Sequence, residues 1–234
     1  MKLSDAVLKR RVFNQGVNDA LQRDTVMGAL GPYLDENRIT IDVGAATGHF
    51  THYFAPRSRR VNAFEAVPQV YMQLLKKEDE FPNVVTHNKA VGDMFGKSSF
   101  FVDDKRLSNS GFLDLVDGPQ IMVDSITLDR FFFRDECQVG FIKIDVEGTE
   151  KRVLEGARKI IQRDRPNLLV EIYEPYCECP IQDIFAWLMA KDYSCYYYHR
   201  PNLVRVPTIE AGVDAVMTKV KIHDGDFLFV SEAD

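Results

Sequence analysis

Apolar and polar positions alternate between two patterns from residue 39 to the end of the chain. Short apolar runs predict strands that are covered on both faces, and stretches with apolar residues at helical spacing separate them. This alternation is typical of βαβ units and a mostly parallel sheet, so the predicted fold class is α/β. The predicted strands are Ile39–Val43, Val61–Glu65, Val84–Asn88, Phe141–Val146, Leu168–Tyr173, Tyr193–His199 and Phe227–Ser231.

Amphipathic stripes mark the helices that connect these strands. A stripe of this kind predicts a helix with one face against the core. The clearest members are Val153, Leu154, Ala157, Ile160 and Ile161 in one stripe and Ile181, Ile184, Phe185 and Leu188 in another.

Two segments depart from the alternation. Residues 1–37 carry weak helical patterns and predict a helical extension or lid, which leaves residues 38–234 as the main domain. The segment Gly96–Arg134 contains two further predicted strands, Lys97–Val102 and Ile121–Ile126. An insertion at this point is expected to lie over the ends of the sheet, where function tends to be located.

Composition and charge narrow the class of protein. The chain has 234 residues, is 45% hydrophobic and 27% charged, and carries a formal net charge of −6, which is typical of a soluble globular protein and disfavours general nucleic-acid binding. Its longest wholly apolar run, Ile184–Ala190, is far shorter than the roughly 20 residues that span a bilayer. Its four cysteines are too scattered for a disulfide framework. We therefore expect a cytoplasmic protein with free thiols.

A glycine-bracketed turn follows the first predicted strand. Gly44 and Gly48 enclose it, and because neither has a Cβ atom the backbone can approach a ligand closely. A dinucleotide fingerprint would need further glycines where Ala46 and His49 stand. The turn therefore lacks a complete pyrophosphate cradle.

Glu65 ends the next predicted strand. A carboxylate at this place can accept hydrogen bonds from both ribose hydroxyls of an adenosine ligand. Together with the glycine turn, Glu65 predicts a site for an adenosine without a diphosphate.

Carboxylates gather where the strand Phe141–Val146 ends. Alternation places Lys143, Asp145 and Glu147 on one side of the strand. A lysine within so apolar a strand needs a carboxylate partner, for which Asp42 and Glu171 are candidates, and we interpret Lys143 as part of a structural ion pair.

These motifs resemble the FkbM-type S-adenosylmethionine-dependent methyltransferases from about Ile39 to Glu171. Their order and spacing carry the resemblance, although Ala46 and Thr47 stand where the family usually has Asn and an aliphatic residue. The matching segments are Ile41–Gly48, Phe64–Pro68, Asn88–Asp93, Thr127–Asp129, Ile142–Glu150, Leu154–Ala157 and Arg165–Ile172.

The resemblance implies a class I methyltransferase fold, Rossmann-like, with a seven-stranded, mostly parallel sheet, helices on both faces and an antiparallel last strand. It implies S-adenosylmethionine as cofactor, with the turn at its methionine end, Glu65 at the ribose and Asp145 facing the reaction centre. The implied cofactor-binding set is Asp42, Gly44, Ala45, Thr47, Gly48, Glu65, Ala66, Ala90, Val91 and Asp145.

Methyl transfer from a sulfonium is an in-line displacement, which depends mainly on positioning. A hydroxyl acceptor also has to lose a proton, and a nearby base helps this step. We predict Asp145 or Glu147 as base or acceptor-orienting group, and leave His49, His52 and His87 out of the catalytic set. No metal ligands are assigned, and metal dependence and oligomeric state stay open.

The expected acceptor is a hydroxyl of a carbohydrate or another small molecule. Methyltransferases that act on base amino groups have an Asp/Asn-Pro-Pro-Tyr loop after the fourth strand, where this chain has Asp145–Gly148. Two alternatives remain: an NAD-dependent oxidoreductase, against which the missing middle glycine counts, and a non-catalytic S-adenosylmethionine-binding module.

Overall fold

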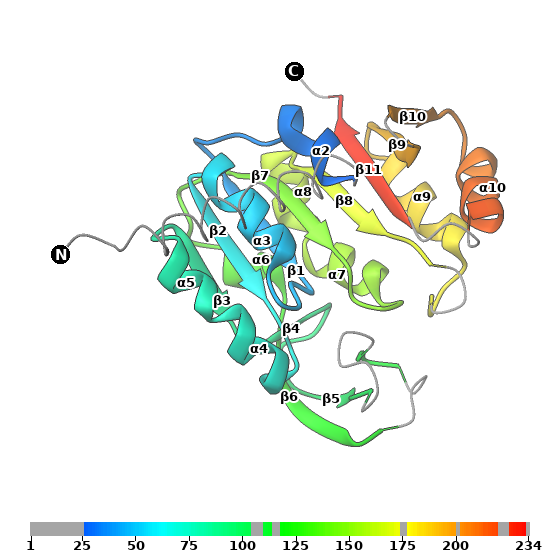
Figure 1. Ribbon diagram of the computed structural model, residues 1–234. Helices are drawn as coiled ribbons and strands as arrows, with labels where there is room; N and C mark the ends of the chain where they lie inside the picture. Colours follow the sequence, from blue (N-terminus) through cyan, green and yellow to red (C-terminus); the bar gives the residue numbers. More distant parts are fainter. Residues whose placement is uncertain are drawn as a thin grey trace, which may run out of the picture.

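One large sheet organises the computed structural model, which describes residues 26–103, 110–113, 118–173, 177–199, 202–219 and 225–232 (Figure 1). The order of its eight strands is β10-β9-β11-β8-β7-β1-β2-β3. Neighbours from β3 to β8 are parallel, whereas β11 is antiparallel to β8 and β9, and β10 is antiparallel to β9. The strands are β1 (Ile39–Val43), β2 (Arg60–Phe64), β3 (Val84–His87), β7 (Val139–Ile144), β8 (Asn167–Glu171), β9 (Tyr193–His199), β10 (Asn202–Val206) and β11 (Asp226–Ser231).

The expected seven strands and the antiparallel last strand are present, but the described sheet has an eighth strand, β10, which the sequence did not predict. The expectation of seven strands is therefore wrong. β10 is a half-exposed edge strand with only Val206 fully buried. Its short apolar stretch follows Pro201 directly, and a proline argues against a strand pattern.

Helices cover both faces of the sheet (Figure 1). The α-helices are α2 (Met27–Leu30), α3 (His49–Phe54), α4 (Pro68–Leu74), α5 (Lys76–Glu80), α6 (Leu128–Phe131), α7 (Glu150–Gly156), α8 (Arg158–Asp164), α9 (Ile181–Met189) and α10 (Ile209–Lys219), and the 3-10 helices are η1 (Gly31–Tyr33) and η2 (Ala55–Arg57). Within the described residues, no helix is both long enough and apolar enough to cross a membrane.

Alternate residues of each central strand enter different parts of the core. Phe141 of β7 packs on Phe54 of α3, with ring centroids 5.5 Å apart. Its neighbour Ile142 belongs to the other cluster, with Val153 of α7 and Ile160 of α8. Burying one such side chain contributes about 1.5–3 kcal/mol, so the continuous apolar runs are explained by strands buried on both faces.

The described end of the predicted N-terminal extension packs against the sheet. Val26 and Leu30 are buried in the cluster that contains Phe54, and Asn167 Nδ2 donates a hydrogen bond to the carbonyl of Tyr33 at 3.1 Å. Residues 1–25 lie outside the described residues, so the expected lid stays a prediction.

A second, three-stranded sheet forms the predicted insertion. Its order is β4-β6-β5, with β4 (Ala90–Val91) parallel to β6 (Gln120–Ile126) and β5 (Gly96–Phe101) antiparallel to β6. The two strands predicted within Gly96–Arg134 are thereby confirmed. β5 and β6 extend beyond the large sheet (Figure 1), and Phe100 packs with Val67 and Val70 near α4.

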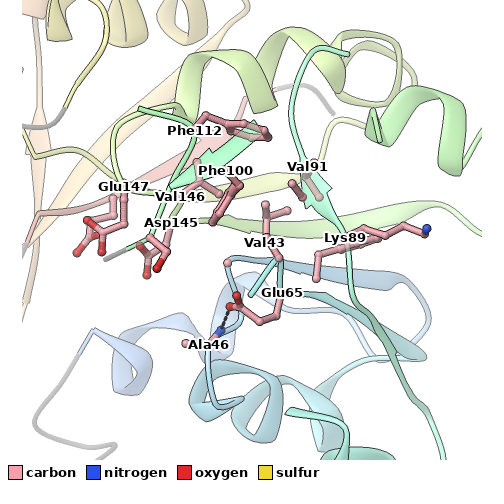
Figure 2. Close-up of a pocket in the computed structure, with 16 residues that line it drawn as sticks. Val43, Ala46, Glu65, Lys89, Val91, Phe100, Phe112, Asp145, Val146 and Glu147 are labelled. Carbon is pink, nitrogen blue, oxygen red and sulfur yellow. Dashed lines mark hydrogen bonds between the residues drawn. The ribbon is translucent and has the colours of Figure 1, made fainter. Parts of the chain in front are cut away.

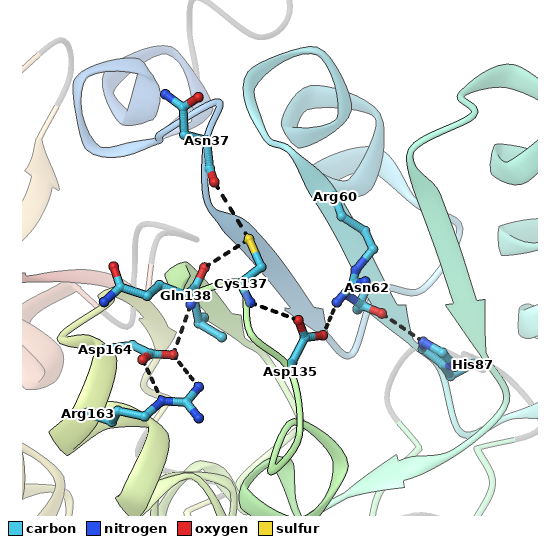
Figure 3. A network of polar contacts seen from close by, with 10 residues as sticks. Asn37, Arg60, Asn62, His87, Asp135, Cys137, Gln138, Arg163 and Asp164 are labelled. Atoms are coloured by element: carbon cyan, nitrogen blue, oxygen red, sulfur yellow. Dashed lines mark hydrogen bonds and ion pairs between the residues drawn. The ribbon is translucent and has the colours of Figure 1, made fainter.

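A polar network holds the amino-terminal ends of β2 and β7 together (Figure 3). Arg60 forms an ion pair with Asp135, which also accepts a hydrogen bond from the backbone N–H of Cys137. The N–H of Val139 donates to Asp164 Oδ2 at 2.9 Å. The four cysteines are free thiols, as expected.

We expect Gly156→Ala to lower the free energy of unfolding by about 1–3 kcal/mol, the range for overpacking. A Cβ atom at Gly156 would lie 2.0 Å from the backbone oxygen of Gly92, so α7 would have to move away from the end of β4. Urea unfolding measures the effect. Gly31→Ala is the matched control, since a Cβ there meets only the Tyr53 hydroxyl at 3.6 Å. Equal stability of both variants would contradict the close contact.

Candidate functional site

A cavity of about 260 Å³ opens at the carboxyl ends of β1, β2, β7 and β8 (Figure 2). In the sheet β1 lies between β2 and β7, so the strand order reverses at this point. Ligands of open α/β sheets bind at such a switch point. The lining residues are Val43, Gly44, Ala46, Phe64, Glu65, Ala66, Lys89, Ala90, Val91, Phe100, Ser110, Phe112, Asp145, Val146, Glu147 and Glu171.

The turn after β1 is shaped by close contact with the end of β7. Gly44 has a φ of 71°, and a Cβ atom there would lie 1.7 Å from the backbone oxygen of Asp145. Only glycine fits, because both the conformation and the contact exclude a side chain. The turn thus joins the two strand ends at the bottom of the cavity.

Glu65 lies at the wall of the cavity and is 9% exposed. Its Oε2 accepts a hydrogen bond from the N–H of Ala46 at 3.0 Å, and its Oε1 accepts one from the N–H of Val67 at 2.8 Å. Burial raises its pKa, and the backbone donors offset only part of that shift. Each carboxylate oxygen has a second lone pair, so Glu65 keeps acceptor capacity for a ligand.

Lys143 forms the ion pair that the sequence predicts, but its first partner is Asp145. Lys143 Nζ lies 2.8 Å from Asp145 Oδ2 and 4.0 Å from Asp42 Oδ1, and the lysine side chain is only 4% exposed. Burial alone would lower its pKa, yet the two carboxylates outweigh burial and raise it. Lys143 therefore stays charged beneath the cavity.

Asp42 lies behind the cavity and is fully buried. Its Oδ2 accepts a hydrogen bond from the Thr51 hydroxyl at 2.6 Å, and burial raises its pKa despite the nearby Lys143. In this position Asp42 supports the lysine and Asp145 rather than lining the cavity.

The structure brings most of the predicted site residues together. Seven of them line the cavity: Gly44, Glu65, Ala66, Ala90, Val91, Asp145 and Glu147. Four do not: Asp42, Ala45, Thr47 and Gly48. Ala45 packs with Ala63 and Leu74, and Thr47 is exposed. The binding roles themselves stay predictions.

Some lining residues were missed from the sequence. Phe100 and Phe112 come from the insertion, with rings edge to face at 5.3 Å, and Figure 2 shows them on the side of the cavity opposite Glu65. The sequence indicated that the insertion would lie over the sheet ends, but no local pattern selects these two aromatic residues.

None of the three excluded histidines lines the cavity. His87 stacks on Phe64, and burial lowers its pKa to about 4, so it is neutral at pH 7. His52 lies 3.3 Å from Glu80 at the surface.

Three carboxylates meet at one side of the cavity. Asp145, Glu147 and Glu171 each offer an oxygen within 4.8 Å of the others, and such a group could hold a metal ion. Burial would raise the pKa of Asp145, but Lys143 and a hydrogen bond with Glu171 outweigh it and lower that pKa. Asp145 is therefore the fixed anion of the group.

Glu147 is the member of this group of three carboxylates whose pKa lies near neutral pH. Burial, followed by the charges of Asp145 and Glu150, raises its pKa to about 7. Its backbone is left-handed with a φ of 55°, an uncommon conformation for a residue with a side chain. Figure 2 shows its carboxylate beside that of Asp145.

Glu150 holds the turn that carries Glu147. As the first residue of α7, it accepts hydrogen bonds at Oε1 from the N–H groups of Gly148 at 3.0 Å and Val146 at 3.3 Å. Burial raises its pKa to about 7. Its contacts indicate a structural role.

The antiparallel strand β11 lies between β8 and β9, and the cavity lies where the strand order reverses. Together these features define a class I methyltransferase fold. The chain belongs to the FkbM methyltransferase family, since the methyltransferase FkbM domain matches residues 42–195. This membership supports S-adenosylmethionine as the cofactor.

This chain is similar to several solved structures at low sequence identity. Methyltransferase FkbM from Methylobacillus flagellatus KT has a TM-score of 0.52 and 17% identity, and the match covers 84% of this chain but only 44% of that longer chain. An rRNA methylase from Streptococcus thermophilus has a TM-score of 0.47 and 15% identity, with 86% and 89% of the two chains covered. A Streptococcus mutans protein in complex with S-adenosylhomocysteine has a TM-score of 0.47 and 14% identity, with 86% and 90% covered. No curated protein matches this chain.

Proposed function

We propose that this protein transfers the methyl group of S-adenosylmethionine to a hydroxyl of a carbohydrate or another small molecule. Family membership supports methyl transfer. A hydroxyl acceptor is supported by Glu147, a carboxylate that lines the cavity. Burial and neighbouring carboxylates raise its pKa to about 7. A base with a pKa near the working pH is the group that hydroxyl attack needs.

The lining of the cavity fits the proposed cofactor. Glu65 can accept hydrogen bonds from ribose hydroxyls, and Ala90 and Val91 provide an apolar wall for adenine. At the other side, Asp145 and Glu147 supply negative charge suited to a sulfonium. The cofactor supplies an electrophilic methyl group when bound.

Two of the cavity carboxylates have separate parts in the proposed reaction. Asp145, held by Lys143, orients the acceptor hydroxyl, and Glu147 takes the hydroxyl proton as the oxygen attacks the methyl carbon in line with the carbon–sulfur bond. Bound S-adenosylmethionine would supply the methyl group and leave as S-adenosylhomocysteine, and the acceptor proton would stay on Glu147.

A cofactor and acceptor screen tests the proposal. Calorimetric titration with S-adenosylmethionine, S-adenosylhomocysteine and NADH comes first, and we expect binding of the first two alone. Formation of S-adenosylhomocysteine is then measured by mass spectrometry with hydroxylated sugars, other small alcohols and phenols, and RNA. Turnover with a hydroxylated small molecule supports the proposal.

The other outcomes identify the rival functions. NADH binding alone would indicate an oxidoreductase, and cofactor binding without turnover on any acceptor would favour a non-catalytic binding module. Methylation of RNA alone would overturn the proposal of a small-molecule acceptor. The net charge of −6 favours a small molecule over a polyanion. The cytoplasmic location stays a prediction.

We expect Glu65→Ala to weaken S-adenosylmethionine binding by about tenfold to a hundredfold, the equivalent of losing hydrogen bonds to a charged group worth about 1.5–3 kcal/mol. The variant removes the proposed ribose acceptor from the cavity wall. Calorimetry measures the affinity, and thermal unfolding checks that the variant is folded. Glu80→Ala is the control, since Glu80 is exposed and pairs with His52 and Lys77. Unchanged affinity of the Glu65 variant would refute the ribose assignment.

A further inference from the structure

Asp145 and Glu171 are neighbours at the ends of adjacent strands. Ile144 of β7 pairs with Val170 of β8. The residues that follow them, Asp145 and Glu171, are therefore neighbours. Each offers a carboxylate oxygen within 4.8 Å of the other's, and both residues line the cavity. A hydrogen bond between the two side chains contributes to the pKa shift of each. Glu171 is packed closely on its other side, because a Cβ atom at Gly225 would lie 3.4 Å from its Cγ.

A hydrogen bond between two carboxyl groups requires one proton. An ionised carboxylate only accepts hydrogen bonds, so one of the two groups has to be a neutral carboxylic acid. Two carboxylates that share a site separate in pKa for the same reason. The surroundings of each group decide which one keeps the proton.

The charges around the pair place the proton on Glu171. Lys143 Nζ lies 2.8 Å from Asp145 Oδ2 and stabilises the anion of Asp145. Glu171 faces mainly carboxylates: Asp145, Glu147 in the same cluster, and Asp226, its partner on β11. Lys143 also lowers the pKa of Glu171, but it does not outweigh them. Burial first, and then the charge of Asp145, raises the pKa of Glu171 to about 10.

We propose that Glu171 is a positioning residue, a neutral carboxylic acid that donates its proton to Asp145 and fixes that carboxylate between itself and Lys143. This inference rests on the proposed function, because it concerns the same cavity. Asp145 then stays an oriented anion, and Glu147 is left as the carboxylate of the cluster that titrates near neutral pH. The chain Lys143–Asp145–Glu171 thus separates the role of orientation from the role of base.

Infrared difference spectroscopy near pH 8.5 tests the proposal without an acceptor. At that pH Glu147 and Glu150, with pKa values of about 7, are ionised. We expect the carbonyl stretch of a protonated carboxylic acid in the wild-type protein, its loss in Glu171→Gln, and its persistence in Glu147→Gln and in the surface control Glu80→Gln. A band that is unchanged in Glu171→Gln would overturn the proposal.

Cofactor binding gives a second readout that a merely structural role would not produce. The amide of Glu171→Gln still donates a hydrogen bond to Asp145, so we expect S-adenosylmethionine affinity within about threefold of the wild type. Glu171→Leu has no donor, and we expect at least about tenfold weaker binding, the cost of one hydrogen bond to a charged group. Equal weakening by both variants would mean that the negative charge of Glu171 is what matters, and would overturn the proposal.

Two further outcomes are distinguishable. Failure of the wild-type protein to bind S-adenosylmethionine would remove the proposed function, while the infrared band would still decide where the proton is. Uptake of Mg²⁺ by the wild-type protein with loss of the band would show that Asp145, Glu147 and Glu171 hold a cation instead of a proton, against the proposal. If Glu171→Leu does not fold, the spectrum of Glu171→Gln decides alone.

Discussion

Lys143→Met is expected to lower the free energy of unfolding by about 3–5 kcal/mol at pH 7, the cost of breaking a buried ion pair by removing one partner. Lys143 is the cation between Asp145 at 2.8 Å and the fully buried Asp42 at 4.0 Å. Methionine fills a similar volume but leaves both carboxylates without their counter-charge. Urea unfolding followed by circular dichroism measures the difference.

The pH dependence of this difference identifies its cause. Because the pKa of Asp145 is lowered in the folded state, its pairing contributes stability above its unfolded pKa of 3.8, and this contribution is lost as the pH falls through the folded value. The difference in the free energy of unfolding between the wild type and Lys143→Met should therefore become smaller below about pH 4. Lys97→Met is the matched control, since Lys97 pairs with Asp124 at the surface, where solvent screens the pair, and its loss should change the free energy of unfolding far less. A difference in the free energy of unfolding that does not change with pH would indicate lost packing instead of a lost ion pair.

The central sheet could be predicted because its strands are buried on both faces. Runs rich in apolar residues, such as Ile39–Val43 with only Thr40 and Asp42 polar, and Leu168–Val170, favour buried strands, and the strands lie within one or two residues of the predicted bounds. The edge strand β10 was not predictable in the same way. In β10 two residues are exposed and two half-exposed, and the strand pairs only with β9 among the described strands, so its few apolar residues carry too weak a signal.

The candidate site was partly predictable because its elements are local in sequence. The turn after β1 and Glu65 after β2 are each read from a few consecutive residues, and both lie at the cavity. Alternation also placed Lys143 and Asp145 on one side of β7, although the partner of the lysine was sought on neighbouring strands. That pair shows how a contact between residues i and i+2 can be overlooked.

The remaining features of the site depend on tertiary contacts. Phe100 and Phe112 reach the cavity because the small sheet packs over the strand ends, and no periodicity within the insertion indicates its distance from β1. The proton on Glu171 depends on which strands flank β8. A sequence with seven candidate strands does not specify that β11 will bring Asp226 beside Glu171.

Glu147→Gln is expected to lower turnover on a hydroxyl acceptor by about a hundredfold to ten-thousandfold, the range for loss of a general base. The amide keeps the shape of the side chain but cannot take a proton from the acceptor hydroxyl. Because Glu147 has to be ionised to act, kcat/KM of the wild type should rise with pH through about 7 and then level off. The variant should lose this rise, and initial rates of S-adenosylhomocysteine formation between about pH 5.5 and 8.5 measure both effects.

Two comparisons separate a base from a residue that binds the cofactor. Calorimetry should find S-adenosylmethionine affinity of Glu147→Gln within a fewfold of the wild type, because an effect confined to the transition state lowers kcat and leaves ground-state binding unchanged. Asp145→Asn removes the anion held by Lys143 and should cost turnover while the rise near pH 7 persists. If instead Asp145→Asn abolishes the rise and Glu147→Gln retains it, Asp145 is the base and Glu147 only shapes the cavity. The two carboxylates differ in their surroundings, one paired with an ammonium and the other facing like charges, and this difference is what assigns the base to Glu147.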